Sequence, residues 1–130
     1  MIYWLTYAGM WLLALLPFKV LYILSDGLCF LMHHVVHYRR RVVRANLCNA
    51  FPEKSAAELR DIEREFYRYI CDYMLEEVKM LRMSFKELCR RMEYDNKEEY
   101  LAMIEKHGGI VLLIPHYANF EWITGMSSIM

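Results

Sequence analysis

Hydrophobic and polar positions divide the chain into two kinds of segment. Residues 2–16 contain no charged side chain and residues 20–36 contain only Asp26, so this first part is almost continuously apolar. From residue 55 onward, apolar positions instead recur every three or four residues, which is the period of an amphipathic helix. The pattern therefore predicts an apolar region followed by helices that each bury one face.

Three helices are predicted after residue 54, over residues 55–81, 84–91 and 96–107. Ser55 and Ser84 each stand three positions before a glutamate, the arrangement of a capping box that satisfies free amides at a helix start. The third helix should stop at Gly108-Gly109, because glycine readily adopts the left-handed conformation that ends helices. The predicted inner face of the first and longest helix comprises Leu59, Ile62, Phe66, Tyr69 or Ile70, Tyr73, Glu77 or Val78, and Leu81.

Two segments have the pattern of strands. Residues 92–94 alternate in polarity, and residues 110–115 (IVLLIP) form a short apolar run directly after the double glycine. Such a run is typical of a strand buried on both faces. A further helix is expected to begin near residue 119. We therefore predict an α/β fold, in which one or two membrane helices and a helical region lead into the start of a mixed or parallel sheet with flanking helices.

The apolar region allows three interpretations, because Pro17 and Lys19 interrupt it and a bilayer-spanning helix needs about 20 apolar residues. It can be one kinked or tilted span, or two helices that lie in the membrane interface. A signal peptide is the least favoured, because no basic start and no small-residue cleavage site are present. We predict that residues 1–38 are a membrane anchor and that residues 39–130 belong to a globular domain.

Charge is unevenly distributed, although the whole chain has 16 basic and 16 acidic residues. Four arginines follow the apolar region directly: Arg39, Arg40, Arg41 and Arg44. Arginines in this position are typical of the cytoplasmic side of a membrane, and each attracts anionic headgroups by about 1 kcal/mol. Anchoring is the favoured role. The alternative is that these arginines bind a phosphate on a lipid or on a carrier cofactor, which guanidinium groups match well.

The strongest candidate for chemistry is His116, which follows the predicted strand, with Glu121 five positions later. Ligands in open α/β sheets bind beyond the carboxyl ends of strands. A carboxylate that hydrogen-bonds one imidazole nitrogen leaves the other nitrogen free to accept a proton from a hydroxyl. The alternative is an ordinary loop histidine with Glu121 complementing a helix dipole. The spacing alone leaves these two interpretations evenly matched.

Other kinds of site are not indicated. Cys29, His33 and His37 share one helical stripe, but no further ligand lies near them and a closed metal site usually needs four. We predict no metal site and no cofactor. The four cysteines form no CxxC pair, which favours isolated thiols over a disulfide framework. Glycine-rich phosphate loops, a GxSxG nucleophile and a nucleic-acid-binding pattern are absent from the sequence.

Three stretches, in this order, resemble the lipid A biosynthesis (late) acyltransferases of the lysophospholipid acyltransferase superfamily. They are residues 39–47 (RRRVVRANL), residues 49–55 (NAFPEKS) and residues 110–122 (IVLLIPHYANFEW). The resemblance covers the amino-terminal part of these longer proteins. It implies a protein on the cytoplasmic face of the bacterial inner membrane.

The resemblance also implies the reaction and its participants. A fatty acyl chain would pass from acyl-acyl carrier protein to a hydroxyl of a lipid A precursor, with His116 as general base, Glu121 orienting it and Asn119 helping to hold the turn. Acyl carrier protein and the membrane lipid would be the partners. Two alternatives remain open: a lysophospholipid or ornithine lipid as acceptor, and an inactive membrane-bound fragment.

Overall fold

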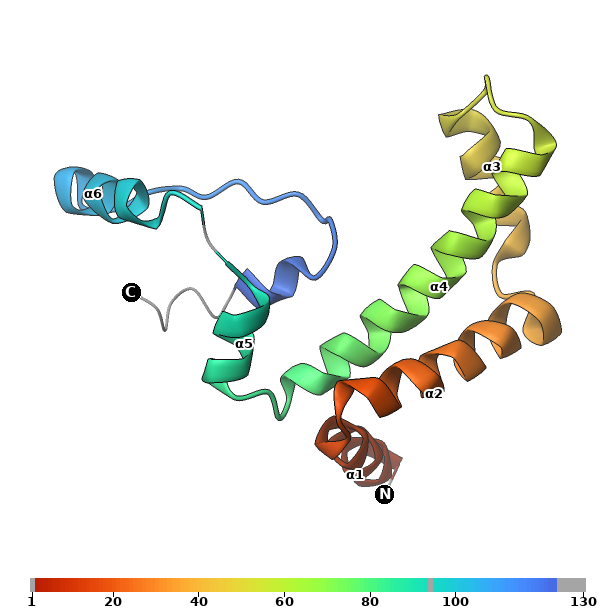
Figure 1. Ribbon diagram of the computed structural model, residues 1–130, viewed down its shortest axis with the longest axis horizontal. Coiled ribbons are helices and arrows are strands. Elements are labelled where there is room, and N and C mark those ends of the chain that lie inside the picture. The colour runs from red at the N-terminus through yellow and green to blue at the C-terminus, as the bar shows by residue number, and fades with distance from the viewer. Residues whose placement is uncertain (1, 94, 124–130) are drawn as a thin grey trace.

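The computed structural model describes residues 2–93 and 95–123 of the chain (Figure 1). Helices and the irregular segments between them make up this part of the protein. In chain order the helical elements are α1 (Ile2–Leu15), α2 (Phe18–Phe30), a wider π-helical turn η1 (Leu31–Val36), α3 (Arg40–Ala50), α4 (Ala56–Met80), α5 (Phe85–Arg91) and α6 (Lys97–His107).

The long helix α4 is the scaffold of the described chain. α1, α2 and α3 all pack against it, and α2 runs antiparallel alongside it, whereas α6 lies away from this bundle (Figure 1). The buried core is small, and α4 contributes to it from the middle of the helix, residues 63–71. Its apolar members are Ala14, Phe18, Leu21, Tyr67, Cys71 and Trp122.

The prediction of one long helix from Ser55 is confirmed. The Ser55 side chain accepts a hydrogen bond from the Glu58 amide, and Glu58 Oε2 accepts one of 2.8 Å from the Ser55 amide, so the capping box is complete. The predicted inner face, however, is rotated. Phe66 and Tyr69 are 39% and 47% exposed.

The residues of α4 that are buried in place of this face are Glu63, Tyr67 and Cys71, spaced four apart. A carboxylate can occupy this stripe because two arginines neutralise it. The hydroxyl of Tyr67 can do so because it donates a hydrogen bond of 2.5 Å to the carbonyl of Tyr38. Buried polar groups that find partners in this way do not incur the full cost of desolvation.

The two shorter helices are also confirmed. Ser84 caps α5 by accepting a hydrogen bond of 3.2 Å from the Glu87 amide. α6 ends at Gly108, which has a φ of 74° and donates its amide to the carbonyl of Ile104. That left-handed conformation is one that glycine adopts without steric cost.

The predicted α/β fold is wrong for the described residues, which contain no strand and no sheet. Residues 110–115 are irregular, and Val111 and Leu113 are each 90% exposed. Residues 92 and 93 are also irregular, and Tyr94 lies outside the described residues. A strand needs a neighbouring strand for its backbone hydrogen bonds. The described chain offers residues 110–115 no such neighbour, so its apolar sequence does not become a strand.

Pro17 divides the apolar region into two helices. Its extended backbone, with a φ of −66° and a ψ of 151°, separates α1 from α2. α1 has 14 residues, or about 21 Å of helix, which is shorter than the roughly 30 Å hydrocarbon core of a bilayer. By length and composition alone, the 19-residue helical segment Phe18–Val36 could cross a membrane. The expected helix after residue 119 is seen only as one tight turn over residues 120–123, because residues 124–130 lie outside the described part.

Candidate active site

Residues 116–123 form a compact turn. The backbone bends at His116, Ala118 adopts a left-handed φ of 52°, and the Trp122 amide donates a hydrogen bond of 3.0 Å to the carbonyl of Asn119. Trp122 is buried, with 6% exposure, and anchors the turn. The turn brings Asn119 and Glu121 against α4.

Two hydrogen bonds attach this turn to α4. The hydroxyl of Tyr73 donates one of 2.5 Å to Oε1 of Glu121, and the side-chain amide of Asn119 donates one to Oε2 of Glu76. The hydroxyl of Tyr22, in α2, donates a bond of 2.6 Å to the other oxygen of Glu76. Tyr73 and Glu76 lie on the same face of α4, because residues three apart in a helix point the same way. One helix face therefore fixes Glu121, Asn119 and α2 together.

The electrostatics of the contact depend on three carboxylates. The hydrogen bond to Glu121 and the charge of Glu121 raise the pKa of Tyr73 to about 12, so this phenol remains a donor at neutral pH. Burial raises the pKa of Glu77, and the neighbouring charges of Glu121 and Glu76 raise it further, while the Trp122 indole acts in the opposite direction. Like charges are thus concentrated where the turn meets the helix.

His116 itself lies at the surface. Its ring packs on Phe120, with ring centroids 4.5 Å apart. The described residues include no hydrogen bond or ion pair between His116 and Glu121. The structure therefore brings Asn119 and Glu121 together on α4 and leaves the imidazole accessible from solvent. The proposed roles of these residues stay predictions.

The four predicted substrate-binding arginines occupy a second region, at the other end of α4. Arg40 Nε lies 2.8 Å from Glu63 Oε1, and Arg44 Nε lies 2.7 Å from Glu63 Oε2. His33 Nε2 is 3.4 Å from the same carboxylate. Burial alone would raise the pKa of Glu63, but the hydrogen bonds and charges of Arg44 and Arg40 outweigh it and hold the pKa below its usual value.

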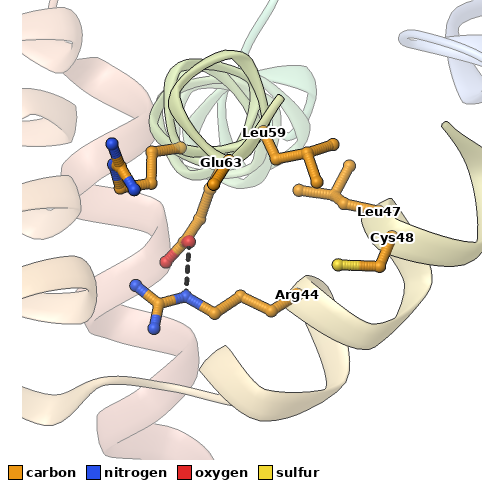
Figure 2. Close-up of a pocket in the computed structure, with 7 residues that line it drawn as sticks. Arg44, Leu47, Cys48, Leu59 and Glu63 are labelled. Atoms are coloured by element: carbon orange, nitrogen blue, oxygen red, sulfur yellow. Dashed lines mark hydrogen bonds and ion pairs between the residues drawn. The ribbon is translucent and has the colours of Figure 1, made fainter. Parts of the chain in front are cut away.

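Figure 2 shows the Arg44 guanidinium and the Glu63 carboxylate pointing toward one another, beside a pocket of about 230 Å³ between α3 and α4. Glu76 is thirteen positions after Glu63 in α4, so the two residues are about 20 Å apart along the helix axis. The two regions are therefore distinct sites on one scaffold. The described residues contain no group of three or more histidine, cysteine or carboxylate side chains that could hold a metal ion.

Sequence reasoning missed Glu63, Tyr73 and Glu76 as residues of these sites. Glu63 had a detectable signal, because it stands at an i, i+4 step from both Leu59 and Tyr67, where an apolar residue is expected. A carboxylate at such a position suggests a buried partner of opposite charge. Tyr73 and Glu76 gave no comparable signal, because their partners lie 48 and 43 residues away.

Comparison with known proteins gives this chain its relatives. A sequence model of the family described as bacterial lipid A biosynthesis acyltransferase matches residues 1–126. The lipid A biosynthesis lauroyltransferase of Escherichia coli (strain K12) is 28% identical over 122 residues, which are 92% of this chain and 40% of that relative. The chain thus spans about two fifths of the length of the curated relative it matches. No solved structure matches the chain.

Proposed function

The chain belongs to the bacterial lipid A biosynthesis acyltransferase family, and from this premise we propose that its protein transfers a fatty acyl chain from acyl-acyl carrier protein to a hydroxyl of a lipid A precursor. The observation that carries the proposal is the attachment of the turn at residues 116–123 to α4 through Tyr73 and Glu76. A histidine followed by a fixed carboxylate is suited to activating a hydroxyl.

In the proposed mechanism, His116 accepts the proton of the acceptor hydroxyl. The resulting oxygen nucleophile attacks the thioester carbonyl of the donor, and the tetrahedral intermediate expels the thiolate of the carrier. The imidazolium then returns its proton to that thiolate, so acid and base balance within one turnover. Glu121 stabilises the charge of the imidazolium through its carboxylate, while Asn119 holds the turn. No covalent acyl-enzyme forms.

The proposed location is the cytoplasmic face of the bacterial inner membrane. α2 packs along α4, whose Glu76 and Lys79 contact α2 and the end of α1. Carrying those charges through the hydrocarbon core would be costly. We therefore favour α1 and α2 lying in the interface, with exposed side chains such as Trp4, Leu5 and Ile23 in contact with lipid. The domain division proposed is residues 1–38 as anchor and residues 39–130 as part of the acyltransferase domain.

The test is acyl transfer by the full-length protein that contains this chain. His116→Gln should reduce the rate by at least 10³-fold with unchanged helix content, because general-base catalysis and the proton transfer that follows it are both lost. Glu121→Gln should reduce it less. His107→Gln, a change at an exposed histidine at the end of α6, is the matched control and should retain full activity. Retained activity in His116→Gln would remove the role assigned to this histidine.

Two alternatives share the same test. A lysophospholipid or an ornithine lipid offered as acceptor distinguishes the substrate classes, because the mechanism is common to all three. The 130 residues by themselves are proposed to be inactive. His116 is exposed and Val111 and Leu113 are 90% exposed, so the described residues next to His116 do not enclose an acyl chain. Measured transfer by the isolated chain would overturn that part of the proposal.

A further inference from the structure

A basic hollow lies where the apolar helices end. Its volume is about 450 Å³, and it directly follows the apolar segment Phe18–Val36. The chain turns there through two residues with left-handed backbones, His37 and Arg39, and then enters α3. The lining residues are His37, Arg39, Arg40, Arg41, Val42 and Arg44.

Glu63 fixes two of these arginines and leaves their outer edges available. Glu63 is 2% exposed. One of its carboxylate oxygens accepts a hydrogen bond from Arg40 Nε, and the other accepts one from Arg44 Nε. A guanidinium has five N–H donors, four of them on the two terminal nitrogens. In the described part of the chain these terminal groups make no hydrogen bond. The contact thus orients both side chains without using the donors that best match a phosphate.

Positive charge exceeds negative charge in the hollow. Four guanidinium groups line it, and Glu63 is the carboxylate in contact with them among the described residues. Arg39 and Arg41 are exposed and form no ion pair within residues 2–93 and 95–123. A cluster of this kind attracts an anion, and two side chains already held in place lose less conformational entropy when they bind one.

The surroundings of the hollow indicate a lipid rather than a soluble phosphate. Val35, Val36 and Val42 are 59%, 58% and 47% exposed beside the arginines. Apolar side chains interleaved with arginines suit the boundary between acyl chains and headgroups. A soluble anion would leave these valines in water.

We propose that this hollow binds the phosphate of an anionic phospholipid headgroup, with Arg39, Arg40, Arg41 and Arg44 as its donors and Glu63 as the residue that positions Arg40 and Arg44. The inference rests on the membrane location proposed above and does not depend on acyl transfer. It changes the role of the arginines from general anchoring to one defined site.

The first experiment measures binding of the 130-residue chain to vesicles by flotation. Vesicles of phosphatidylcholine alone report insertion of the apolar helices, and vesicles with one third phosphatidylglycerol report the headgroup contribution. Arg39→Gln/Arg41→Gln should lose about 30-fold of the binding to phosphatidylglycerol vesicles, at about fivefold for each arginine near the surface. Binding to phosphatidylcholine should stay unchanged.

The matched control is Lys97→Gln/Lys106→Gln, which removes the same charge from exposed positions of α6. It should keep the preference for phosphatidylglycerol. An equal loss in both double variants would mean diffuse attraction to the whole protein and would overturn the proposal. Failure of the wild-type chain to bind either vesicle would instead count against the membrane location and with it this inference.

The second experiment uses Glu63→Gln, for which the two explanations predict different changes in binding. The substitution adds one positive charge, so simple charge attraction predicts about fivefold tighter binding to phosphatidylglycerol vesicles. A site positioned by Glu63 predicts equal or weaker binding, because Arg40 and Arg44 lose the carboxylate that orients their side chains. Tighter binding would overturn the positioning role. If circular dichroism shows that this variant is unfolded, the Arg39 and Arg41 variant decides alone, since both side chains are exposed.

The final arm separates a lipid phosphate from a soluble one. Sodium phosphate and sodium chloride at equal ionic strength should displace the chain from phosphatidylglycerol vesicles to the same extent. Stronger displacement by phosphate, together with phosphate binding to the chain in the absence of vesicles, would reassign the hollow to a soluble phosphate and overturn the choice of a lipid.

Discussion

The hydroxyl of Tyr73 donates a hydrogen bond of 2.5 Å to the carboxylate of Glu121, across 48 residues of sequence. This contact joins the middle of α4 to the turn that contains the proposed catalytic residues. With the bond from Asn119 to Glu76, it makes the orientation of that turn depend on α4 rather than on the residues just before it. The first three predictions concern this contact between α4 and the turn at residues 116–123.

Tyr73→Phe should loosen the turn without unfolding the chain. The ring can still stack on Tyr69, but the hydrogen bond to Glu121 is lost. Amide exchange over residues 119–123 should become about threefold to tenfold faster, with helix content unchanged. Tyr69→Phe is the control, because Tyr69 is 47% exposed and its hydroxyl makes no hydrogen bond in the described chain. Exchange at the wild-type rate in Tyr73→Phe would show that this bond does not hold the turn.

Glu76→Gln should destabilise the chain by about 1–2 kcal/mol. Glu76 accepts one hydrogen bond from Tyr22 and another from Asn119, and an amide can accept at only one of its two ends. The free energy of unfolding in urea, measured in mild detergent, tests this. Asp72→Asn, which changes a carboxylate one turn earlier in the same helix, serves as control and should have a smaller effect. A stability equal to wild type would contradict the bridging role of Glu76.

Glu77→Gln should have the opposite effect and stabilise the chain at pH 7. Burial and the charge of Glu121 raise the pKa of Glu77 in the folded state above its usual 4.5. A raised pKa means that stability from this group is present below the unfolded value and lost as pH rises through the folded one. The amide is neutral throughout, so the variant should gain at pH 7, and its gain should vanish below pH 4.5. Melting temperatures of variant and wild type across this range test the sign.

Glu63→Gln should cost about 2–3 kcal/mol at pH 7. The two arginines lower the pKa of Glu63 despite its burial, with His33 and Tyr67 also facing it. A lowered pKa means that the stability is present above the usual value of 4.5 and is lost as pH falls through the folded value. The deficit of the variant relative to wild type should therefore shrink in acid. A deficit that is constant with pH would show that the charge of Glu63 is not what stabilises this contact.

Lys79→Met should release α1 from α4. The ammonium group donates hydrogen bonds of 2.8 Å and 2.7 Å to the carbonyls of Ala14 and Leu16, which lie at the end of α1. Met keeps the apolar stem and loses both bonds, a cost of about 1–3 kcal/mol. Protease cleavage between α1 and α2 should become faster, whereas Lys86→Met, at an exposed lysine of α5, should leave it unchanged. Resistance equal to wild type would mean that apolar packing alone holds α1.

Features that depend on a few neighbouring residues could be predicted from the sequence. The helix starts at Ser55 and Ser84 and the stop at Gly108 are set by local hydrogen bonds and backbone preference, and the structure has all three. The prediction of a strand at residues 110–115 was wrong, since an apolar run becomes a strand only beside a partner strand. The sequence pattern contains the run but not the partner.

The candidate sites divide in the same way. His116 and Glu121 stood out because the sequence places them five positions apart, but the attachment of Glu121 to Tyr73 depends on how α4 meets a distant turn. The sequence shows the four arginines as a cluster, but it does not show that Glu63 holds two of them and that the other two form no ion pair in the described chain. Glu63 was detectable as a carboxylate at an apolar helix position, but the sequence does not show which arginines neutralise it there.

The bonds from Lys79 to the carbonyls of Ala14 and Leu16 also bear on the order in which the protein is made. The ribosome completes α1 more than 60 residues before it adds the lysine that holds the end of α1 to α4. During that interval the end of α4 is not yet available to hold α1. At the membrane location proposed above, α1 is therefore exposed to lipid before the Lys79 end of α4 is made, and the contact between α1 and α4 forms afterwards.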